Sequence, residues 1–314
     1  MSNYGEHRNQ GSGKTFGASL LALALAAIGI ACGGGKSSPQ APAQTPAPSG
    51  QPTFSHVVLI MEENHGYSDV VGSSTMPYLN SLISQYGLAA QYYADAHPSM
   101  PNYLMVTTGQ MESYDDNFSG VISDDNVVRE LVKAGKSWKA YEESIPSAGY
   151  LGGDQGAYVR RHDPFSYLSD IQNDSAQAAN IVPYTQFATD LASNSLPQYS
   201  FIAPNVNDDA HNGTLAQADS WLQSNVPALL ANPAFQSSGL LIITFDESEL
   251  TDVQNGGGHV ATLIISSQAK KGYQSQTMYQ HQSVLRLILA SSGASTFPGK
   301  AGNAPDMTEF FTGH

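Results

Sequence analysis

The stretch Phe54-Ser-His-Val-Val-Leu-Ile-Met61 ends in a continuous run of apolar and β-branched residues. Such a run predicts a strand that is buried on both faces, as in a parallel sheet. Comparable runs occur at residues 199–204, 239–245 and 260–266, and a shorter one occurs at residues 138–141. Together these stretches predict the strands of one sheet.

Segments with helical spacing of apolar residues separate these strands. They cover residues 76–86, 126–134, 216–231 and 283–290. Strands that alternate with helices predict an α/β protein, a three-layer α/β/α sandwich with a mostly parallel central sheet. We expect a single domain over residues 53–314, in which residues 144–180 form a long excursion that covers a site.

The N-terminal segment has the layout of a secretory signal peptide, predicted over residues 1–31. Basic residues precede an apolar run at residues 16–31 that is too short and too rich in Ala for a membrane span. Small residues stand immediately before Cys32, which resembles the cleavage box of bacterial lipoproteins. There Cys32 would carry the lipid and become the mature N-terminus. The alternative is an ordinary signal peptide with an incidental cysteine.

The segment after Cys32 cannot bury a core. Residues 32–52 are rich in Pro, Ser, Ala and Gln, which predicts an extended, semi-rigid linker. We therefore expect a protein that is exported across the inner membrane and held in the cell envelope by a lipid anchor on Cys32.

Charge and cysteine content narrow the classes of function. The net charge is −14 and only 13 residues are Lys or Arg, which argues against nucleic acid as a partner. An acidic protein that handles an anionic substrate needs a local cation, although acidity can also serve solubility alone. A single cysteine excludes a disulfide framework or a Cys-based metal site within one chain.

Polar side chains follow three of the predicted strands at the point where each strand ends. Because the carboxyl ends of parallel strands meet at one edge of a sheet, we expect these side chains to converge. The candidates are Glu63, Asn64, Asp209, His211, Asp246 and Glu247. Asp and Asn are also common at strand ends as turn formers and helix caps, which is the competing interpretation.

Clustered carboxylates repel one another unless protons or a cation intervene. Oxygen ligands with an occasional imidazole suit Mg, Ca or Mn and, less specifically, Zn or Fe. The pattern therefore predicts a divalent metal site.

A candidate nucleophile lies in the motif His97-Pro-Ser-Met-Pro-Asn-Tyr103. Residues 89–96 lead into it as a predicted strand, and residues 102–108 lead out as a predicted helix. Ser99 at such a turn would lie near free helix N–H groups, which stabilise a phosphate or an oxyanion. The alternative is a simple helix cap.

The ordered set of motifs resembles a known family. Residues 57–69 resemble the opening motif of the bacterial phosphoesterase family, which includes acid phosphatases and phosphatidylcholine-type phospholipases C. Residues 97–103 resemble its nucleophile motif and the Thr-containing nucleophile segment of nucleotide pyrophosphatases in the alkaline phosphatase superfamily. Further similar segments are residues 138–146, 158–164, 209–211, 219–222, 244–247, 257–259 and 279–281.

The resemblance implies a role for each matching residue. Glu63, Asn64, Asp246 and Glu247 would bind the metal, and Ser99 would attack phosphorus. Asn102 would hold a phosphoryl oxygen. The remaining site residues carried over are His211 and His162 as phosphate ligands or proton donors, Asp209 as the partner that orients His211, and His259 and His281 as substrate-binding residues.

The family pattern also bears on the number of metal ions. Members with two metals bind them through Asp and His ligands. Here the first ligand position is Glu63-Asn64, and Glu247 stands where those members have His. This departure favours one divalent ion.

Three functions follow from these expectations. The first is an acid-phosphatase-like phosphomonoesterase that works through a phosphoserine. The second is a phospholipase C that cleaves lipid head groups; the short chain, without the C-terminal domains of many such enzymes, favours monoesters instead. The third is a catalytically inactive binding lipoprotein of the envelope, against which the intact Ser99 and the full set of metal ligands argue.

Overall fold

The central strand is β1 (His56–Glu62), formed by the apolar run quoted above. The computed structural model describes residue 50 and residues 52–312. In it, β1 pairs in parallel with β5 (Tyr199–Ala203) on one side and with β6 (Gly239–Phe245) on the other. Both neighbours are buried along their whole length, and β1 is buried from Val57 onward. The run is apolar at successive positions because helices cover both faces of the sheet.

The sheet has eight strands in the order β4-β3-β5-β1-β6-β7-β2-β8. Besides the central three, its members are β3 (Trp138–Glu142), β4 (Ile181–Pro183), β7 (Thr262–Ile265), β2 (Gly87–Ala89) and β8 (Gln274–Ser275). All neighbouring strands pair in parallel except at the two edges of β7. The predicted mostly parallel sheet is thus confirmed.

The apolar run at residues 260–266 differs from the expectation. It forms β7 and runs antiparallel to β6. The connection between these strands contains no helix, and a parallel return would need a crossover of a dozen or more residues, which is usually helical. Likewise, the strand predicted at residues 89–96 is limited to Gly87–Ala89, and only isolated bridges at Tyr92 and Tyr93 continue it.

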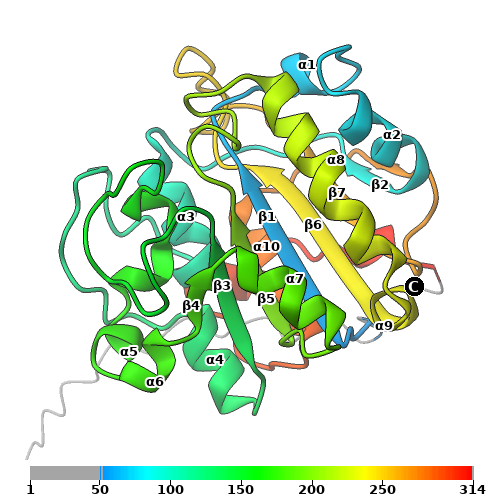
Figure 1. Cartoon of the computed structure of the whole chain (residues 1–314). Coiled ribbons are helices and arrows are strands. Elements are labelled where there is room, and N and C mark those ends of the chain that lie inside the picture. The colour runs from blue at the N-terminus through cyan, green and yellow to red at the C-terminus, as the bar shows by residue number, and fades with distance from the viewer. Residues whose placement is uncertain (1–49, 51, 313–314) are drawn as a thin grey trace, which may run out of the picture. The chain divides into compact units, whose positions relative to one another are not determined.

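Helices cover the two faces of the sheet and make the predicted three layers (Figure 1). In the view of Figure 1, one layer lies behind the sheet and consists of α3 (Ser99–Thr108), α4 (Val127–Lys133) and α10 (His281–Ser291). The layer in front consists of α2 (Pro77–Gln85), α7 (Thr185–Ala192), α8 (Leu215–Ala231) and α9 (Pro233–Ser238). The remaining helical turns are α1 (Tyr67–Val70), α5 (Ser169–Gln172), α6 (Ser175–Ala178) and 3-10 turns at Arg160–His162, Pro164–Tyr167, Gly299–Asn303 and Thr308–Phe310.

The excursion at residues 144–180 belongs partly to the core. Its aromatic side chains Phe165 and Tyr167 are buried, and the ring of Phe165 stacks on Trp138 of β3 at 5.1 Å. The Arg160 guanidinium lies over the ring of Tyr167, 4.2 Å from the ring centroid, and makes a cation–π contact with it. Because these rings are packed, the segment presents His162 from a fixed position.

Asp219 of α8, in the motif segment at residues 219–222, has a structural role. Its carboxylate accepts hydrogen bonds from the backbone N–H groups of Tyr78 and Leu79, at 2.9 and 2.8 Å. These groups are in the first turn of α2, which has no side-chain cap of its own. A residue from one helix therefore caps its neighbour and fixes the packing of α2 on α8.

The predicted signal peptide, Cys32 and nearly all of the Pro-rich linker lie outside the described residues. Among the residues that the structure describes, no helix combines the length and apolar character needed to cross a membrane.

Candidate active site

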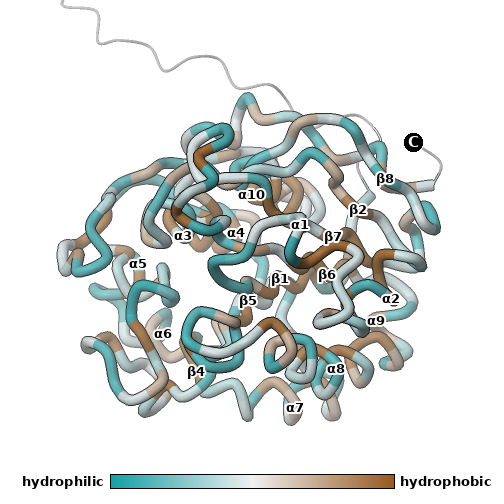
Figure 2. The backbone as a smooth tube through the Cα atoms, turned by 90° about the horizontal axis from the view of Figure 1, so that it is seen from above, coloured by the Kyte–Doolittle hydropathy of each residue, from teal (hydrophilic) through white to brown (hydrophobic). Residues whose placement is uncertain are grey.

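The site lies at the carboxyl ends of β1, β5 and β6, the upper edge of the sheet in Figure 1, which Figure 2 shows from above. Backbone hydrogen bonds continue beyond the strands and bring their ends together. The N–H of Glu63 donates to the carbonyl of Asp209 at 2.9 Å, and the N–H of Asp246 donates to the carbonyl of Glu62 at 2.9 Å. The register of the sheet therefore places the acidic residues of three strand ends side by side.

Ser99 is the first residue of α3 and lies among these carboxylates. Its hydroxyl donates to Glu63 Oε2 at 3.1 Å and lies 3.5 Å from Glu247 Oε1. The side chain is buried, and the first turn of the helix points its N–H groups toward the same region. The helix begins at Ser99, three residues earlier than predicted, so the hydroxyl sits at the helix terminus itself.

Asp246 links the other two acidic segments. Its Oδ1 accepts hydrogen bonds from the backbone N–H groups of Asn64 at 3.1 Å and of Glu247 at 2.6 Å. Asn64 adopts a φ of 59°, in the left-handed region, which turns its N–H toward this carboxylate. The second oxygen, Oδ2, is buried and has no hydrogen-bond partner among the described residues.

Burial dominates the electrostatics of these carboxyls. It raises the pKa of Asp246 to about 7, that of Asp209 to about 8 and that of Glu247 to about 9. The pKa of Glu63 lies well above its ordinary value, first because of burial and then because of Asp246 and Asp209. Four acids that resist ionisation in one place need a cation to hold them as carboxylates at neutral pH.

The residues present fit a divalent ion. Several buried atoms could bind a cation: Asp246 Oδ2, Asp209 Oδ2 and both ring nitrogens of His162 have no hydrogen-bond partner in the described part of the chain. Glu63, Asn64, Asp246 and Glu247 are the donor set predicted from the sequence. Ligand atoms of Glu63, His162 and His211 also lie within 4.8 Å of one another, so this second set shares Glu63 with the first.

His162 faces this cluster from the 3-10 turn at Arg160–His162. Its Nε2 lies 3.2 Å from Glu63 Oε1 and its Nδ1 lies 3.2 Å from Asp209 Oδ2, without the alignment of a hydrogen bond. The ring stacks on Tyr103 at 5.0 Å, and the Tyr103 hydroxyl donates to Glu63 Oε1 at 2.5 Å. Burial holds the pKa of His162 well below its ordinary value, so the ring is neutral and available as a metal ligand.

His211 lies next to His162, with 5.7 Å between the ring centroids. Asp209 orients it through the backbone, since Asp209 Oδ1 accepts from the N–H of His211 at 2.7 Å. The ring itself contacts Asn212 Oδ1 at 3.0 Å and Arg161 Nη2 at 3.2 Å. Arg161 was not foreseen from the sequence, and it is a cation beside the phosphate-handling candidates.

Asn102 is placed differently from the expectation. Its Oδ1 accepts from the N–H groups of Asp95 and Ala96, at 3.0 and 3.1 Å, and its Nδ2 donates to the carbonyls of Ala96 and Pro98, at 2.7 and 3.3 Å. The side chain is fully buried. All of its hydrogen-bonding capacity serves the loop before Ser99, so in this structure Asn102 is a positioning residue.

The two remaining histidines contact the scaffold. His281 is fully buried, with Nε2 at 2.6 Å from the carbonyl of Asp246 and Nδ1 at 3.0 Å from the Tyr92 hydroxyl; burial lowers its pKa to about 4. His259 lies between the rings of Tyr67 and Tyr93, at 4.2 and 4.8 Å. His281 thus supports a candidate metal ligand through its backbone, whereas His259 packs within the loops.

Two further features escaped the sequence interpretation. His97 Nδ1 contacts Glu247 Oε2 at 2.6 Å while its Nε2 contacts the carbonyl of Asp252 at 2.8 Å, which fixes the Glu247 carboxylate. A Cβ on Gly256 or Gly257 would lie 2.0 or 2.3 Å from the carbonyl oxygens of Asp95 and Ala96. His97 and Gly257 lie within the motifs, but nothing in the spacing of the motifs showed which neighbours these residues would contact.

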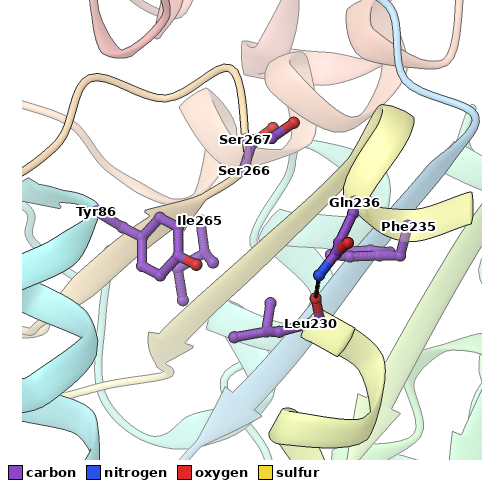
Figure 3. A pocket seen from close by; sticks show the side chains of 7 residues that line it. All are labelled: Tyr86, Leu230, Phe235, Gln236, Ile265, Ser266 and Ser267. Atoms are coloured by element: carbon purple, nitrogen blue, oxygen red, sulfur yellow. Dashed lines mark hydrogen bonds between the residues drawn. The ribbon is translucent and has the colours of Figure 1, made fainter. Parts of the chain in front are cut away.

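A separate pocket lies away from the strand ends that carry the acids (Figure 3). Its lining is Tyr86, Leu230, Phe235, Gln236, Ile265, Ser266 and Ser267. No carboxylate, histidine or basic side chain is among them. This pocket therefore lacks the types of side chain that gather around Ser99.

The fold is shared with proteins of the alkaline phosphatase superfamily. Solved structures with this fold include a protein of that superfamily from Vibrio parahaemolyticus, with a TM-score of 0.57 and 14% identity over 82% of this chain and 71% of that one. A phosphonate monoester hydrolase from Silicibacter pomeroyi gives a TM-score of 0.55 and 13% identity over 83% of this chain and 77% of that one. These likenesses show the shared fold.

Sequence similarity is more specific. Residues 72–293 match the model of the phosphoesterase family, so the chain belongs to that family and is a phosphoric ester hydrolase. A phosphatidylinositol-3-phosphatase of Mycobacterium tuberculosis is 31% identical over 84% of this chain and 85% of its own length. An acid phosphatase of Aspergillus fumigatus is 30% identical over 76% of this chain, which spans 55% of that relative. The family resemblance seen in the motifs is confirmed.

The placement of Asn102 leads to a prediction about stability. Asn102→Ala should lower the free energy of unfolding by about 2–4 kcal/mol, because it leaves several buried backbone groups of the loop without partners. Urea unfolding of the metal-free protein would measure this. If the variant keeps wild-type stability and loses only activity, the side chain turns toward substrate during the reaction and the positioning role is wrong.

Proposed function

We propose that the protein hydrolyses phosphate monoesters through a phosphoserine at Ser99, with one divalent ion held by Glu63, Asn64, Asp246 and Glu247. The observation that carries the proposal is the Ser99 hydroxyl at the terminus of α3, hydrogen-bonded to Glu63 and close to Glu247. Glu63 can accept the proton of the serine, and the N-terminus of α3 can stabilise negative charge on a phosphoryl group.

The chain's own residues support the first step as follows. The Ser99 proton passes to Glu63 Oε2, which already accepts its hydrogen bond at 3.1 Å. Ser99 Oγ forms a bond to phosphorus as the bond from phosphorus to the alcohol oxygen breaks in line. His211 is the candidate that protonates the departing oxygen, and Arg161 beside it offsets negative charge on the phosphoryl group.

The second step regenerates the serine. Water attacks phosphorus in the phosphoserine and gives a proton to His211, which lost one in the first step; the bond to Ser99 Oγ breaks, and Ser99 recovers its proton from Glu63. Tyr103, which donates to Glu63 Oε1, keeps that carboxyl in place through both steps. A bound divalent ion would supply charge compensation and polarisation of the phosphoryl group.

The comparisons favour monoesters over head-group cleavage. The relatives are named phosphatidylinositol-3-phosphatase and acid phosphatase, and both names describe removal of a phosphate group. An inactive binding protein does not need a buried serine set among unpaired carboxyls. We therefore infer a phosphomonoesterase ahead of a phospholipase C or a binding lipoprotein.

We further propose that the enzyme works in the cell envelope, tethered through a lipid on Cys32. The supporting feature is the run of small residues that ends at the only cysteine. Cys32→Ser should shift the protein from the membrane fraction to the soluble fraction or block its processing. Unchanged membrane association of the variant would show that the lipid anchor is not what retains the protein.

The nucleophile gives a direct test. Ser99→Ala should reduce kcat by at least about three orders of magnitude, because the covalent route is lost. Acid quench of the wild type with labelled substrate should trap phosphate on Ser99. Ser248→Ala serves as a matched control, since Ser248 is also buried next to the site and its hydroxyl donates to Glu249. Near wild-type turnover by the Ser99 variant would refute the covalent mechanism.

Metal binding should appear as a change in the pH dependence of stability. The raised pKa values of Asp246, Asp209 and Glu247, about 7, 8 and 9, mean that the metal-free folded state holds protons that the unfolded state releases. Their stabilising protonation is complete at low pH and is lost as pH rises through these values. The loss begins at about pH 4, where the unfolded carboxyls ionise, and it levels off above about pH 9. We therefore expect the Tm of chelated protein to fall between about pH 7 and 9, above the range in which His162 and His281 titrate, and to change little beyond it.

Added Mg, Mn or Zn should raise the Tm most at the alkaline end of this range, because the ion replaces the lost protons. Asp246→Asn, which removes one of the acids, should weaken both the pH dependence and the response to metal. A chelated protein with a flat pH profile and full activity would contradict the metal site.

A further inference from the structure

Asp116 places a carboxylate beside the residue that follows Ser99. Its Oδ1 accepts a hydrogen bond from the backbone N–H of Met100 at 3.2 Å. Met100 directly follows Ser99 in the first turn of α3. A carboxylate therefore occupies the N–H of the residue that follows Ser99 in the first turn of the helix.

Hydrogen bonds of the neighbouring residues fix the turn that contains Asp116. The backbone N–H of Phe118 donates to the carbonyl of Asp115 at 2.8 Å, and Asp115 Oδ1 accepts from the N–H of Asn117 at 2.9 Å. The ring of Phe118 packs against Tyr167 at 5.6 Å and joins this turn to the core. Asp116 thus lies within a tight turn, and the packing of Phe118 on Tyr167 holds this turn against the core.

The charge of Asp116 reaches the catalytic groups. Asp116 is one of the causes, after burial and Asp246, that raise the pKa of Glu247. Within residues 52–312, no ion pair joins Asp116 to a Lys or Arg side chain. Its charge is therefore not offset by a neighbouring cation of the protein.

An anionic ligand meets two costs at this point. It is repelled by the Asp116 carboxylate, and it competes with that carboxylate for the Met100 N–H. The repulsion is proportional to the charge of the ligand. A phosphate monoester or inorganic phosphate with two negative charges therefore loses about twice the free energy that a singly charged ester loses.

We propose that Asp116 is a specificity-determining residue that weakens binding of dianionic phosphoryl groups relative to monoanionic ones. The inference rests on the proposed reaction at Ser99 and deepens it, because it sets the charge class of ligand that the site accepts and retains. It also accounts for release of the phosphate product from a site built to stabilise phosphoryl oxygens.

The test compares three variants of the full chain, each loaded with the same divalent ion. Asp116→Asn removes the charge but keeps an oxygen for the Met100 N–H, whereas Asp116→Ala removes both. Asp115→Asn is the matched control, since it makes the same change of net charge one residue away and keeps its acceptor for Asn117. Calorimetric titration with inorganic phosphate at about pH 8, where phosphate is mostly dianionic, measures binding without turnover.

Asp116→Asn should bind inorganic phosphate about tenfold more tightly than the wild type, the effect of one partly screened charge at close range. Asp116→Ala should bind it at least as tightly. Turnover adds a second readout: kcat/KM should rise about tenfold for p-nitrophenyl phosphate and about threefold for the monoanionic p-nitrophenyl methylphosphonate. Asp115→Asn should change each value by less than about twofold.

Each other result overturns the inference. Equal tightening by the Asp115 and Asp116 variants would assign the effect to the overall acidity of the surface. Unchanged phosphate affinity and an unchanged ratio between the two esters, in an active enzyme, would refute a role for Asp116 while leaving the proposed reaction intact. Absence of both phosphate binding and hydrolysis in the metal-loaded wild type would refute the proposed reaction and this inference together.

Discussion

Mutual repulsion among buried carboxyls is the constraint on which the site depends. Glu63, Asp209, Asp246 and Glu247 come from three strand ends and have little access to water. Their burial makes ionisation costly, and each ionised member makes the next more costly. A protein that assembles such a group must supply protons or a cation, and the unpaired oxygens and imidazole nitrogens around it are suited to receive one.

The parallel sheet provides the rigidity that this arrangement requires. β1, β5 and β6 are paired over most of their length, and the hydrogen bonds beyond their ends continue the same alignment. The packing and hydrogen bonds of the sheet therefore hold the acids together, although their side chains repel one another. Ser99, the proposed nucleophile, comes from a different element, and Asn102 ties the loop before Ser99 into a shape that presents the hydroxyl to Glu63.

Much of the fold and of the acidic cluster could be predicted from the sequence. Strands that are apolar at every position require a sheet covered on both faces, and acids placed directly after such strands meet at one edge of that sheet. The run at residues 260–266 shows the limit: its composition predicts a buried strand, but direction depends on the connection that precedes it. The partners of individual side chains could not be predicted in the same way. The amide of Asn102 could face substrate or backbone with the same sequence, and His97, Tyr103 and Arg161 acquire their partners only when segments distant in the chain meet.

The glycines at 256–258 connect two parts of the site that are far apart in sequence. The N–H of Gly257 donates to the carbonyl of Ala94 at 3.1 Å, and the N–H of Ala94 donates to the carbonyl of Gly258 at 2.9 Å. With no Cβ in between, the loop that follows Asp246 and Glu247 and the loop that carries Ser99 lie backbone against backbone. Neither loop can open without breaking the hydrogen bonds of the other, so the two form one cooperative unit of local unfolding. Ser99 and the acids Asp246 and Glu247 are thus expected to become ordered together and to be lost together.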